Sequence, residues 1–416
     1  MEEAILVYIE LEGVPIKVGR LWGRYRKGRE SMSFEYDRDW LQHPQRFSLD
    51  PALELTKGAF HASHEKPLFG AIDDSAPDRW GRLLMRRSER KLAIQERRTA
   101  RSLREIDYLL RVNDFGRQGA LRFKLEENAP FLTTYERGHI PPLIAVGKLL
   151  TAANHVLQEA DTEEDLRLLL APGSPLGGAR PKASVLEKDG HLAIAKFPRK
   201  DDEIDACLWE AVALTLAAKA EIQVPTWRIE SAGREKILLS RRFDRKKEIR
   251  IPFLSAMSAL GARDDEMHSY LEIADAIRRM SSSPKEDLEA LWRRMIFTVL
   301  ISNVDDHLRN HAFLYTGIAG WRLSPAYDLN PTPTDIKPRV LSTAIDLVDP
   351  TASIDLALDV AEYFDLSPQK AKSILREVGR TTALWRVEAA KLKIKKQAID
   401  RMASAFEHED LKKSLK

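Results

Sequence analysis

The stretch that decides the fold is "ISNVDDHLRNHAFLY", residues 301–315. It places two acids, two histidines and two asparagines within nine residues. Residues 287–301 show the apolar spacing of a helix, so the polar side chains begin where that helix ends. The pattern of residues 312–324, "AFLYTGIAGWRLS", predicts a β-hairpin directly afterwards.

Asp305 and Asn310 are five residues apart, which is the D-x-x-x-x-N spacing of a kinase catalytic loop. In such a loop the Asp accepts the proton of the attacking hydroxyl and the Asn oxygen holds a magnesium ion. Asp328, in "LSPAYDLNPT", follows the hairpin, which returns the chain and supplies a second metal-binding acid. Mg²⁺ favours sparse oxygen ligands completed by phosphates and water. The pattern therefore predicts phosphoryl transfer.

The other polar residues of this stretch have more than one interpretation. We expect Asp306 to cap the loop or to face solvent. His307 either orients the loop by hydrogen bonding or is an ordinary loop residue. His307 and His311 are four residues apart and could bind zinc on a helix, but the Glu of an H-E-x-x-H site is missing.

Residues 172–184, "PGSPLGGARPKAS", form a glycine-rich loop whose backbone N–H groups can approach an anion. It lacks the Walker pattern. "SVLEK", an Asp189-Gly190 turn and "HLAIAKF" then predict a hairpin. Lys196 ends an apolar row on the return strand, which we expect to face inward. Such a lysine either holds nucleotide phosphates or reaches solvent at the strand end.

Segments around this hairpin extend the prediction. We expect a helix at 204–219, where Glu210 either pairs with Lys196 or lies on the surface. "KILLSRRFDR", residues 236–245, predicts a strand that could meet an adenine ring through its backbone. Residues 80–111 should be helical and contain "RRSERKLAIQERRTARSLR". We favour a solvated helical face for that basic segment, with a patch for DNA phosphates or an acidic partner as the alternative.

Composition limits the class of protein. The chain has 416 residues, 44% hydrophobic and 31% charged, with a net charge of +3, as in ordinary globular proteins. Cys207 is the single cysteine, so an intrachain disulfide is impossible and a cytoplasmic location is expected. Residues 3–36 predict strands and not a signal peptide, and no apolar run predicts a membrane span.

Several motifs together resemble the HipA family of bacterial serine/threonine kinases, the toxins of toxin–antitoxin pairs. "LFGAIDDSAPDRWGR", "SPLGGARPK", "AIAKFP", "SRRFDR", "NVDDHLRN" and "LSPAYDLNP" occur in the family's order. The resemblance implies a mixed α/β (α+β), protein-kinase-like two-lobed fold with a small N-terminal α/β subdomain and an all-helical C-terminal lobe. The implied domains are the N-terminal subdomain (1–135), the kinase N-lobe (136–250) and the kinase C-lobe (251–416).

The resemblance also implies roles for single residues. Asp305 resembles the catalytic base, with His307 beside it, and Asn310 and Asp328 resemble the magnesium ligands. Ser174 falls near the family's autophosphorylated serine. The residues that resemble the ATP site are Gly177, Gly178, Ala179, Arg180, Lys182, Lys196, Arg241 and Phe243.

Partners and alternatives follow from the same resemblance. It implies ATP and Mg²⁺ as cofactors, a helix-turn-helix antitoxin partner (HipB-like), DNA contact only through that complex, and a bacterial protein substrate. That substrate could be a translation component such as an aminoacyl-tRNA synthetase. One alternative is a non-catalytic DNA- or antitoxin-binding module, because "LALDVAEYFDLSPQKAKSILREVG" (356–379) has a helix–turn–helix pattern. The other is a metal-dependent phosphohydrolase, which would not need the glycine loop and Lys196.

Overall fold

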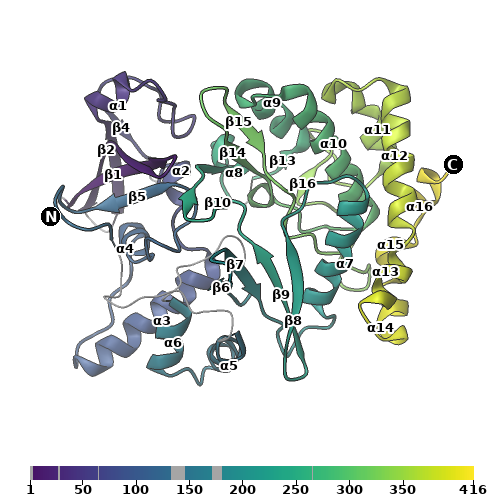
Figure 1. The fold of residues 1–416 in the computed structure, drawn as a ribbon, viewed down its shortest axis with the longest axis horizontal. Coiled ribbons are helices and arrows are strands. Elements are labelled where there is room, and N and C mark those ends of the chain that lie inside the picture. The colour runs from purple at the N-terminus through teal and green to yellow at the C-terminus, as the bar shows by residue number, and fades with distance from the viewer. Residues whose placement is uncertain (1–2, 27–28, 64, 133–145, 171–179, 265) are drawn as a thin grey trace. The chain divides into compact units, whose positions relative to one another are not determined.

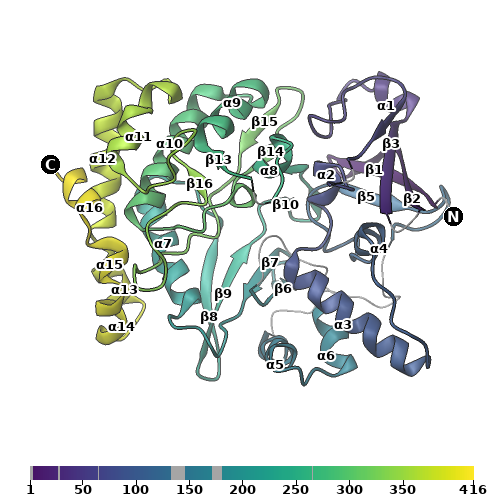
Figure 2. The ribbon, with the colours of Figure 1, turned by 180° about the vertical axis from the view of Figure 1, so that it is seen from behind.

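The computed structural model of the chain describes residues 3–26, 29–63, 65–132, 146–170, 180–264 and 266–416. The chain forms two compact units, unit 1 with residues 1–199 and 230–254, and unit 2 with residues 200–229 and 255–416 (Figures 1 and 2). Helices and strands are mixed, which confirms the predicted fold class. The division at residues 135 and 250 stays a prediction, and residue 135 lies outside the described ranges.

Unit 1 begins with a five-stranded antiparallel sheet in the order β4-β3-β2-β1-β5. Alternate residues Ile5, Val7 and Ile9 are buried because side chains alternate between the faces of a strand. The strands predicted within residues 3–36 are confirmed. The strands are β1 (Glu3–Leu11), β2 (Val14–Arg26), β3 (Arg29–Tyr36), β4 (Ala59–His61) and β5 (Leu121–Lys124), with short helices α1 (Arg38–Gln42), α2 (Gly70–Asp73) and α4 (Glu105–Leu110).

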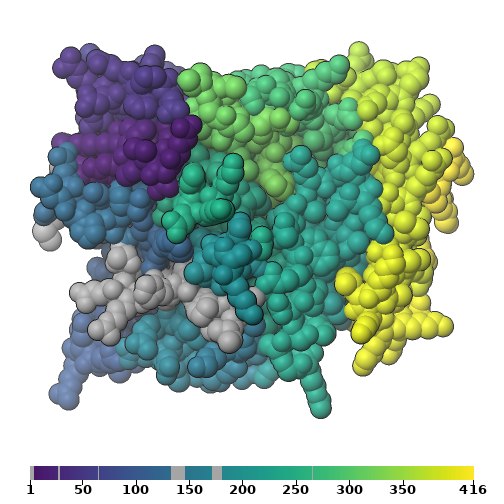
Figure 3. Space-filling view, viewed as in Figure 1, coloured from purple at the N-terminus to yellow at the C-terminus, as the bar shows by residue number. Residues whose placement is uncertain are grey.

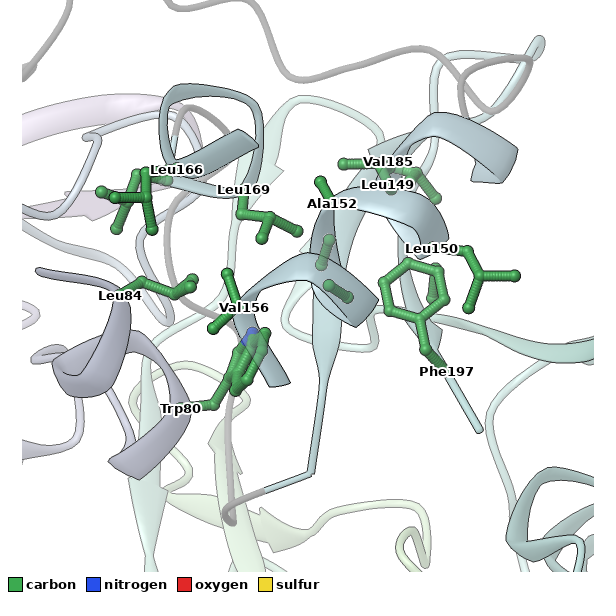
Figure 4. Packing of buried hydrophobic residues seen from close by; sticks show 14 of the residues in the cluster. Trp80, Leu84, Leu149, Leu150, Ala152, Val156, Leu166, Leu169, Val185 and Phe197 are labelled. Carbon is green, nitrogen blue, oxygen red and sulfur yellow. The ribbon is translucent and has the colours of Figure 1, made fainter. Parts of the chain in front are cut away.

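The rest of unit 1 packs helices on a second sheet, in which β6, β7 and β9 lie side by side. Figure 4 shows their shared core, where Trp80 lies beside Val156 and Phe197 lies beside Leu150. The predicted hairpin and the strand at "KILLSRRFDR" are confirmed. The helix expected over residues 80–111 is confirmed in part, because α3 ends at Gln95 and residues 96–104, which carry the second half of the basic segment, are not helical. The elements are α3 (Arg79–Gln95), α5 (Val146–Leu157), α6 (Glu163–Leu170), β6 (Lys182–Leu186), β7 (Leu192–Lys196), β9 (Glu235–Arg241), β10 (Arg245–Lys246) and β11 (Ile249–Arg250); β8 (Trp227–Ala232) and β12 (Phe253–Ser255) cross the boundary between the units.

The core face of β7 is not the one that the sequence predicts. Ala193 and Ala195 join the core cluster, whereas Ile194 and Lys196 are half-buried on the opposite face. The expectation that Lys196 continues the inward-facing row was therefore wrong. Alanine contributes little to a hydrophobic pattern, so the larger Leu192 and Ile194 suggested the wrong face for the core.

Unit 2 is mainly helical. Its central helix α10 (Pro284–Leu300) is buried on every side from Leu291 to Leu300. Most of these residues are apolar, and the buried Arg293 and Arg294 donate to Glu377 and to the Ser324 backbone oxygen. The C-terminal helices, yellow in Figures 1 and 3, lie side by side at one edge of this unit. Trp385 stacks on Phe406 there, with ring centroids 4.6 Å apart. No helix among the described residues is long and apolar enough to cross a membrane.

The remaining elements of unit 2 include the hairpin predicted over residues 312–324, β14 with β15, and a parallel pair, β13 with β16. The helix expected at 204–219 is confirmed as α7. The helices are α7 (Ala206–Lys219), α8 (Ala256–Ala259), α9 (Tyr270–Met280), α11 (Ile354–Asp359), α12 (Pro368–Thr382), α13 (Trp385–Lys391), α14 (Lys396–Arg401), α15 (Ala403–Phe406) and α16 (Glu409–Ser414), with 3-10 helices η2 (Leu308–Asn310) and η3 (Ala361–Phe364). The strands are β13 (His268–Ser269), β14 (Ala312–Tyr315), β15 (Trp321–Leu323) and β16 (Thr343–Ala344).

Candidate active site

The loop between α10 and β14 closes on itself around Asp305. The side-chain Nδ2 of Asn310 donates to the backbone oxygen of Asp305 at 3.1 Å, and the Asn310 backbone N–H donates to His307 O at 2.8 Å. Asp305 is exposed, with its carboxylate 3.6 Å from Lys337 Nζ. The loop therefore presents the Asp305 carboxylate on its exposed side, with Lys337 as its charged neighbour.

Asp306 has the opposite environment. It is only 3% exposed and accepts hydrogen bonds from the Tyr270 hydroxyl, His311 Nε2 at 3.0 Å and Thr298 Oγ1 at 3.4 Å. The expectation that Asp306 caps the loop or faces solvent was wrong. The turn sends consecutive side chains to opposite sides, so one acid points out and the next points in. Burial alone would raise the pKa of Asp306, but His311 and Tyr270 hold it below its ordinary value.

The two histidines of the loop differ in the same way. His307 is half-buried, and its Nδ1 has no hydrogen-bond partner among the residues that the structure describes. Its role in orienting the loop stays a prediction. His311 is buried with Nε2 against Asp306, so this ring supports the loop from within.

The segment after β15 returns to the loop, as the sequence predicts. The Tyr327 hydroxyl donates to Arg309 O at 2.6 Å, and Asn330 N donates to Asn303 Oδ1 at 3.2 Å. Asp328 lies within this returning segment, half-buried, with a left-handed backbone at φ +59°. That conformation is uncommon for a residue other than glycine and often marks a functional constraint.

The donors that these segments provide fit a magnesium ion. Asn310 Oδ1 is buried and has no partner within the described ranges, and Asp328 adds a carboxylate. Both are hard oxygen donors of the kind that Mg²⁺ prefers. The described parts of the chain contain no group of three or more His, Cys, Asp or Glu side chains able to hold a metal. A metal here would therefore depend on these two residues together with phosphate and water oxygens.

In unit 1, part of the predicted nucleotide site can be placed. Ser174, Gly177, Gly178 and Ala179 lie outside the described residues, and Arg180 is exposed. Lys182 starts β6 and is paired in register with Lys196 on β7. It is 3% exposed, its Nζ lies 2.7 Å from Asp78 Oδ2, and its backbone oxygen accepts from Trp80 Nε1 at 3.0 Å. The motif "SAPDRWGR" thus anchors the strand that leaves the glycine loop, a role that sequence reasoning missed.

The remaining predicted ATP-site residues lie at the end of β9. Arg241 is opposite Ala193 in the ladder, and its guanidinium pairs with Glu187 and Asp189 of the β6–β7 turn. Gly190 completes that turn at φ +82°, a conformation that glycine adopts without strain. Phe243 is half-buried, with its ring 6.5 Å from that of Phe253.

Glu210 is 4% exposed in α7 of unit 2, so its reading as a surface residue was wrong.

The motif "SRRFDR" contains a buried ionic cluster that sequence reasoning also missed. Asp244 accepts from Arg242 Nη2 at 2.6 Å, from Arg245 Nη1 at 2.9 Å and from Gly119 N at 2.8 Å. Arg242 also donates to Gly116 O at 2.6 Å. Burial lowers the pKa of Arg245 to about 9, although the Asp244 carboxylate opposes this. The signal in the sequence was the repeated arginine around an acid. The cluster also contacts Gly116 and Gly119, which lie more than a hundred residues away along the chain.

Comparison with known proteins agrees with this geometry. The chain matches the family models of the HipA-like C-terminal domain over residues 174–385 and the HipA N-terminal domain over residues 14–108. It is 25% identical over 364 residues to "Putative kinase Y4mE" of Sinorhizobium fredii, covering 77% of this chain and 78% of that protein. A "Putative kinase" of Haemophilus influenzae is 33% identical over 69 residues, which cover 17% of this chain and 20% of that protein.

A solved structure has the same fold. HipA of Shewanella oneidensis MR-1, in a toxin–antitoxin complex with HipB and operator DNA, superposes with a TM-score of 0.68 at 15% identity. The match covers 99% of this chain and 96% of that one. At this identity the likeness concerns the fold.

Proposed function

This chain belongs to the HipA family of kinases, and on that premise we propose that it transfers the γ-phosphoryl group of ATP to a serine or threonine hydroxyl of a protein. The observation that supports the proposal most is the loop around Asp305. An exposed carboxylate lies five residues from a buried amide oxygen that has no partner among the described residues. This is the arrangement that a base beside a metal ligand requires.

In this proposal, each residue has one role. Asp305 accepts the proton of the attacking hydroxyl as the oxygen–phosphorus bond forms and the bond to the ADP oxygen breaks. Asn310 Oδ1 and the Asp328 carboxylate would hold Mg²⁺, which neutralises the charge of the phosphates. Lys196, with the backbone of the glycine loop, would hold the phosphates, and the backbone after Arg241 would meet the adenine. Lys182 and Arg241 are engaged by carboxylates of unit 1, so we assign them to shaping the site.

The direct test is incubation of the purified chain with Mg²⁺ and ATP labelled at the γ-phosphate. We expect label in serine or threonine of this protein, and loss of about 10²–10⁴-fold in rate for Asp305→Ala with ATP affinity retained, because a base acts on the chemical step. Asp328→Ala should instead weaken the dependence of ATP binding on Mg²⁺. Release of inorganic phosphate with no phosphoprotein would favour a phosphohydrolase and contradict this proposal.

Self-phosphorylation of Ser174 is a second part of the proposal. A phosphate adds about −1.5 to −2 charges just ahead of the glycines that would receive the ATP phosphates, so like charges should repel. We expect ATP affinity to fall after incubation with Mg-ATP and to remain high in Ser174→Ala treated in the same way. Mass spectrometry identifies the modified residue, and a Ser174-phosphorylated protein that binds ATP normally would contradict this switch.

The antitoxin partner and the protein substrate of this chain are also proposals. The HipB and operator DNA bound to the similar HipA support a helix-turn-helix antitoxin as a partner of this chain, with DNA contacted through that complex. The substrate would be a bacterial protein, for which a translation component such as an aminoacyl-tRNA synthetase is our candidate class. Co-purification with the product of a neighbouring reading frame tests the first proposal, and phosphorylation of purified synthetases tests the second.

A further inference from the structure

The basic segment around α3 divides into arginines that are neutralised within the fold and arginines that are not. Glu89, the single acid of α3, is 2% exposed and lies 2.7 Å from Arg98 Nη1, 3.3 Å from Arg111 Nη2 and 3.8 Å from Arg101 Nε. Burial would raise the pKa of Glu89, but these arginines lower it to about 2. Arg87 pairs with Asp161 at 2.7 Å. This set stabilises the fold of unit 1.

A second set has no such partners. Arg79, Arg86 and Arg90 are exposed, and none of them makes an ion pair or hydrogen bond with any residue in the described ranges. Arg86 follows Arg79 by seven residues, which is nearly two helical turns, and Arg90 follows Arg79 by eleven residues, which is about three turns. All three therefore lie on one stripe of α3, spaced by about 10 Å and about 6 Å along its axis.

The stripe is held rigidly by the opposite side of the helix. Trp80, Leu84 and Met85 are buried in the core of unit 1, where Figure 4 shows Trp80 and Leu84 facing α5 and α6. Asp78 caps the helix by accepting from Gly81 N at 2.8 Å. Since the helix has no other acid than the buried Glu89, the stripe has no countercharge of its own.

We propose that this stripe, Arg79 with Arg86 and Arg90, binds the phosphate backbone of double-stranded nucleic acid. Guanidinium groups match phosphate oxygens in bidentate geometry. Interfaces with DNA are polar and strongly basic, whereas interfaces between proteins have an apolar centre. No large apolar residue is exposed between the three arginines, and Leu83, which lies on the same side, packs against the core. The apolar side chain exposed beside the stripe is Ile94, one turn beyond Arg90 at its end. This charge complementarity favours a polyphosphate over an acidic protein.

The test measures binding of the purified full chain, without any partner protein, to a fluorescent 30-base-pair DNA duplex of random sequence at several salt concentrations. We expect the triple variant Arg79→Ala, Arg86→Ala, Arg90→Ala to bind at least tenfold more weakly at low salt. Loss of three phosphate contacts should make the slope of log K against log salt shallower by about 2.7. The triple lysine variant at the same positions keeps the charges and should retain most of the slope.

The matched control removes the same net charge elsewhere in unit 1, by substituting alanine for the exposed Arg26, Arg38 and Arg234. This control should bind DNA with an unchanged slope. Equal losses in the two triple alanine variants would overturn the proposal, because net charge alone would then explain binding. Binding of poly-L-glutamate by the unmodified chain in preference to the duplex would overturn it in favour of an acidic protein partner.

Discussion

At the scale of single residues, Asp305 and Asp306 are neighbours in opposite environments, and they should respond in opposite ways to the same substitution. Asp305→Asn should lower the rate of phosphoryl transfer by about 10²–10⁴-fold and leave thermal stability unchanged, since its side chain is exposed. Asp306→Asn should destabilise unit 2 by about 1.5–3 kcal/mol, because hydrogen bonds to a buried charged group are lost. Activity assays and calorimetry on both variants measure the two effects.

The dependence on pH gives a control for this pair. The pKa of Asp306 is lowered on folding, so its contribution to stability is present above the ordinary carboxyl pKa of about 3.9 and is lost as the pH falls below it. The stability of the Asp306→Asn variant should therefore converge with that of the unmodified protein in acid. A constant difference at every pH would mean that the carboxylate charge is not the cause.

Lys196 is half-buried on the face of β7 away from the core, which suits a side chain that meets a ligand. We expect Lys196→Met to weaken ATP binding or turnover without unfolding the chain, because an ammonium there would hold phosphate. Lys188→Met, at the exposed turn of the same hairpin, is the matched control and should change neither. A rise in melting temperature with full activity in Lys196→Met would show that the lysine has no part in the site.

At the scale of elements, α16 begins with a histidine as its N-cap. His408 Nδ1 accepts from Leu411 N at 3.4 Å, and Nε2 donates to Leu300 O at 3.2 Å. Protonation of Nδ1 would remove the cap. Burial is the main cause that lowers the pKa of His408 to about 4, and Arg339 lowers it further.

The sign of the resulting pH dependence follows from that shift. The folded pKa lies below the unfolded value of about 6.5, so the unfolded chain binds the proton more tightly. The contribution of His408 to the free energy of unfolding should be fully present above pH 6.5. It should decline towards pH 4 by at most about 1.4 kcal/mol per pH unit. His408→Asn keeps a capping side chain and should flatten the decline between pH 7.5 and 5 in thermal melts. An equally steep decline in that variant would exclude His408 as the cause.

At the scale of the whole molecule, the proposed roles fall on both compact units. The proposed phosphate lysine, Lys196, belongs to unit 1, and Asp305, Asn310 and Asp328 belong to unit 2. Mg-ATP should therefore raise the melting temperature of the full chain. The free energy of unfolding should rise by about 2.7 kcal/mol when ATP is at a hundred times its dissociation constant. ATP with a chelator should have a smaller effect.

The matched variants for this measurement are Lys196→Met and Asp328→Ala, one in each unit. Each should reduce the stabilisation by Mg-ATP if its side chain contributes to nucleotide binding. Full stabilisation in either variant would remove that residue from the site, and no stabilisation of the unmodified chain would contradict nucleotide binding itself.

Local patterns in the sequence determined much of this protein. The β1–β3 strands, the β6–β7 hairpin, α7, α10 and the hairpin after residue 311 follow from periodicity and turn residues, which act over a few neighbours. The spacing of Asp305 and Asn310 is equally local, because five residues suffice to close the loop. These features, with the order of the motifs, were enough to identify the fold class and the family.

Only the tertiary structure decided which of two adjacent acids faces solvent, and it reversed the expected face of β7. It also decided that Lys182 meets Asp78, and that Glu89 pairs with three arginines while Arg79, Arg86 and Arg90 have no ion-pair partner among the described residues. The physical reason is that burial and charge pairing depend on partners distant along the chain. A carboxylate or a lysine has the same letter in either environment, and only packing determines whether its charge stabilises the fold or remains available to a ligand.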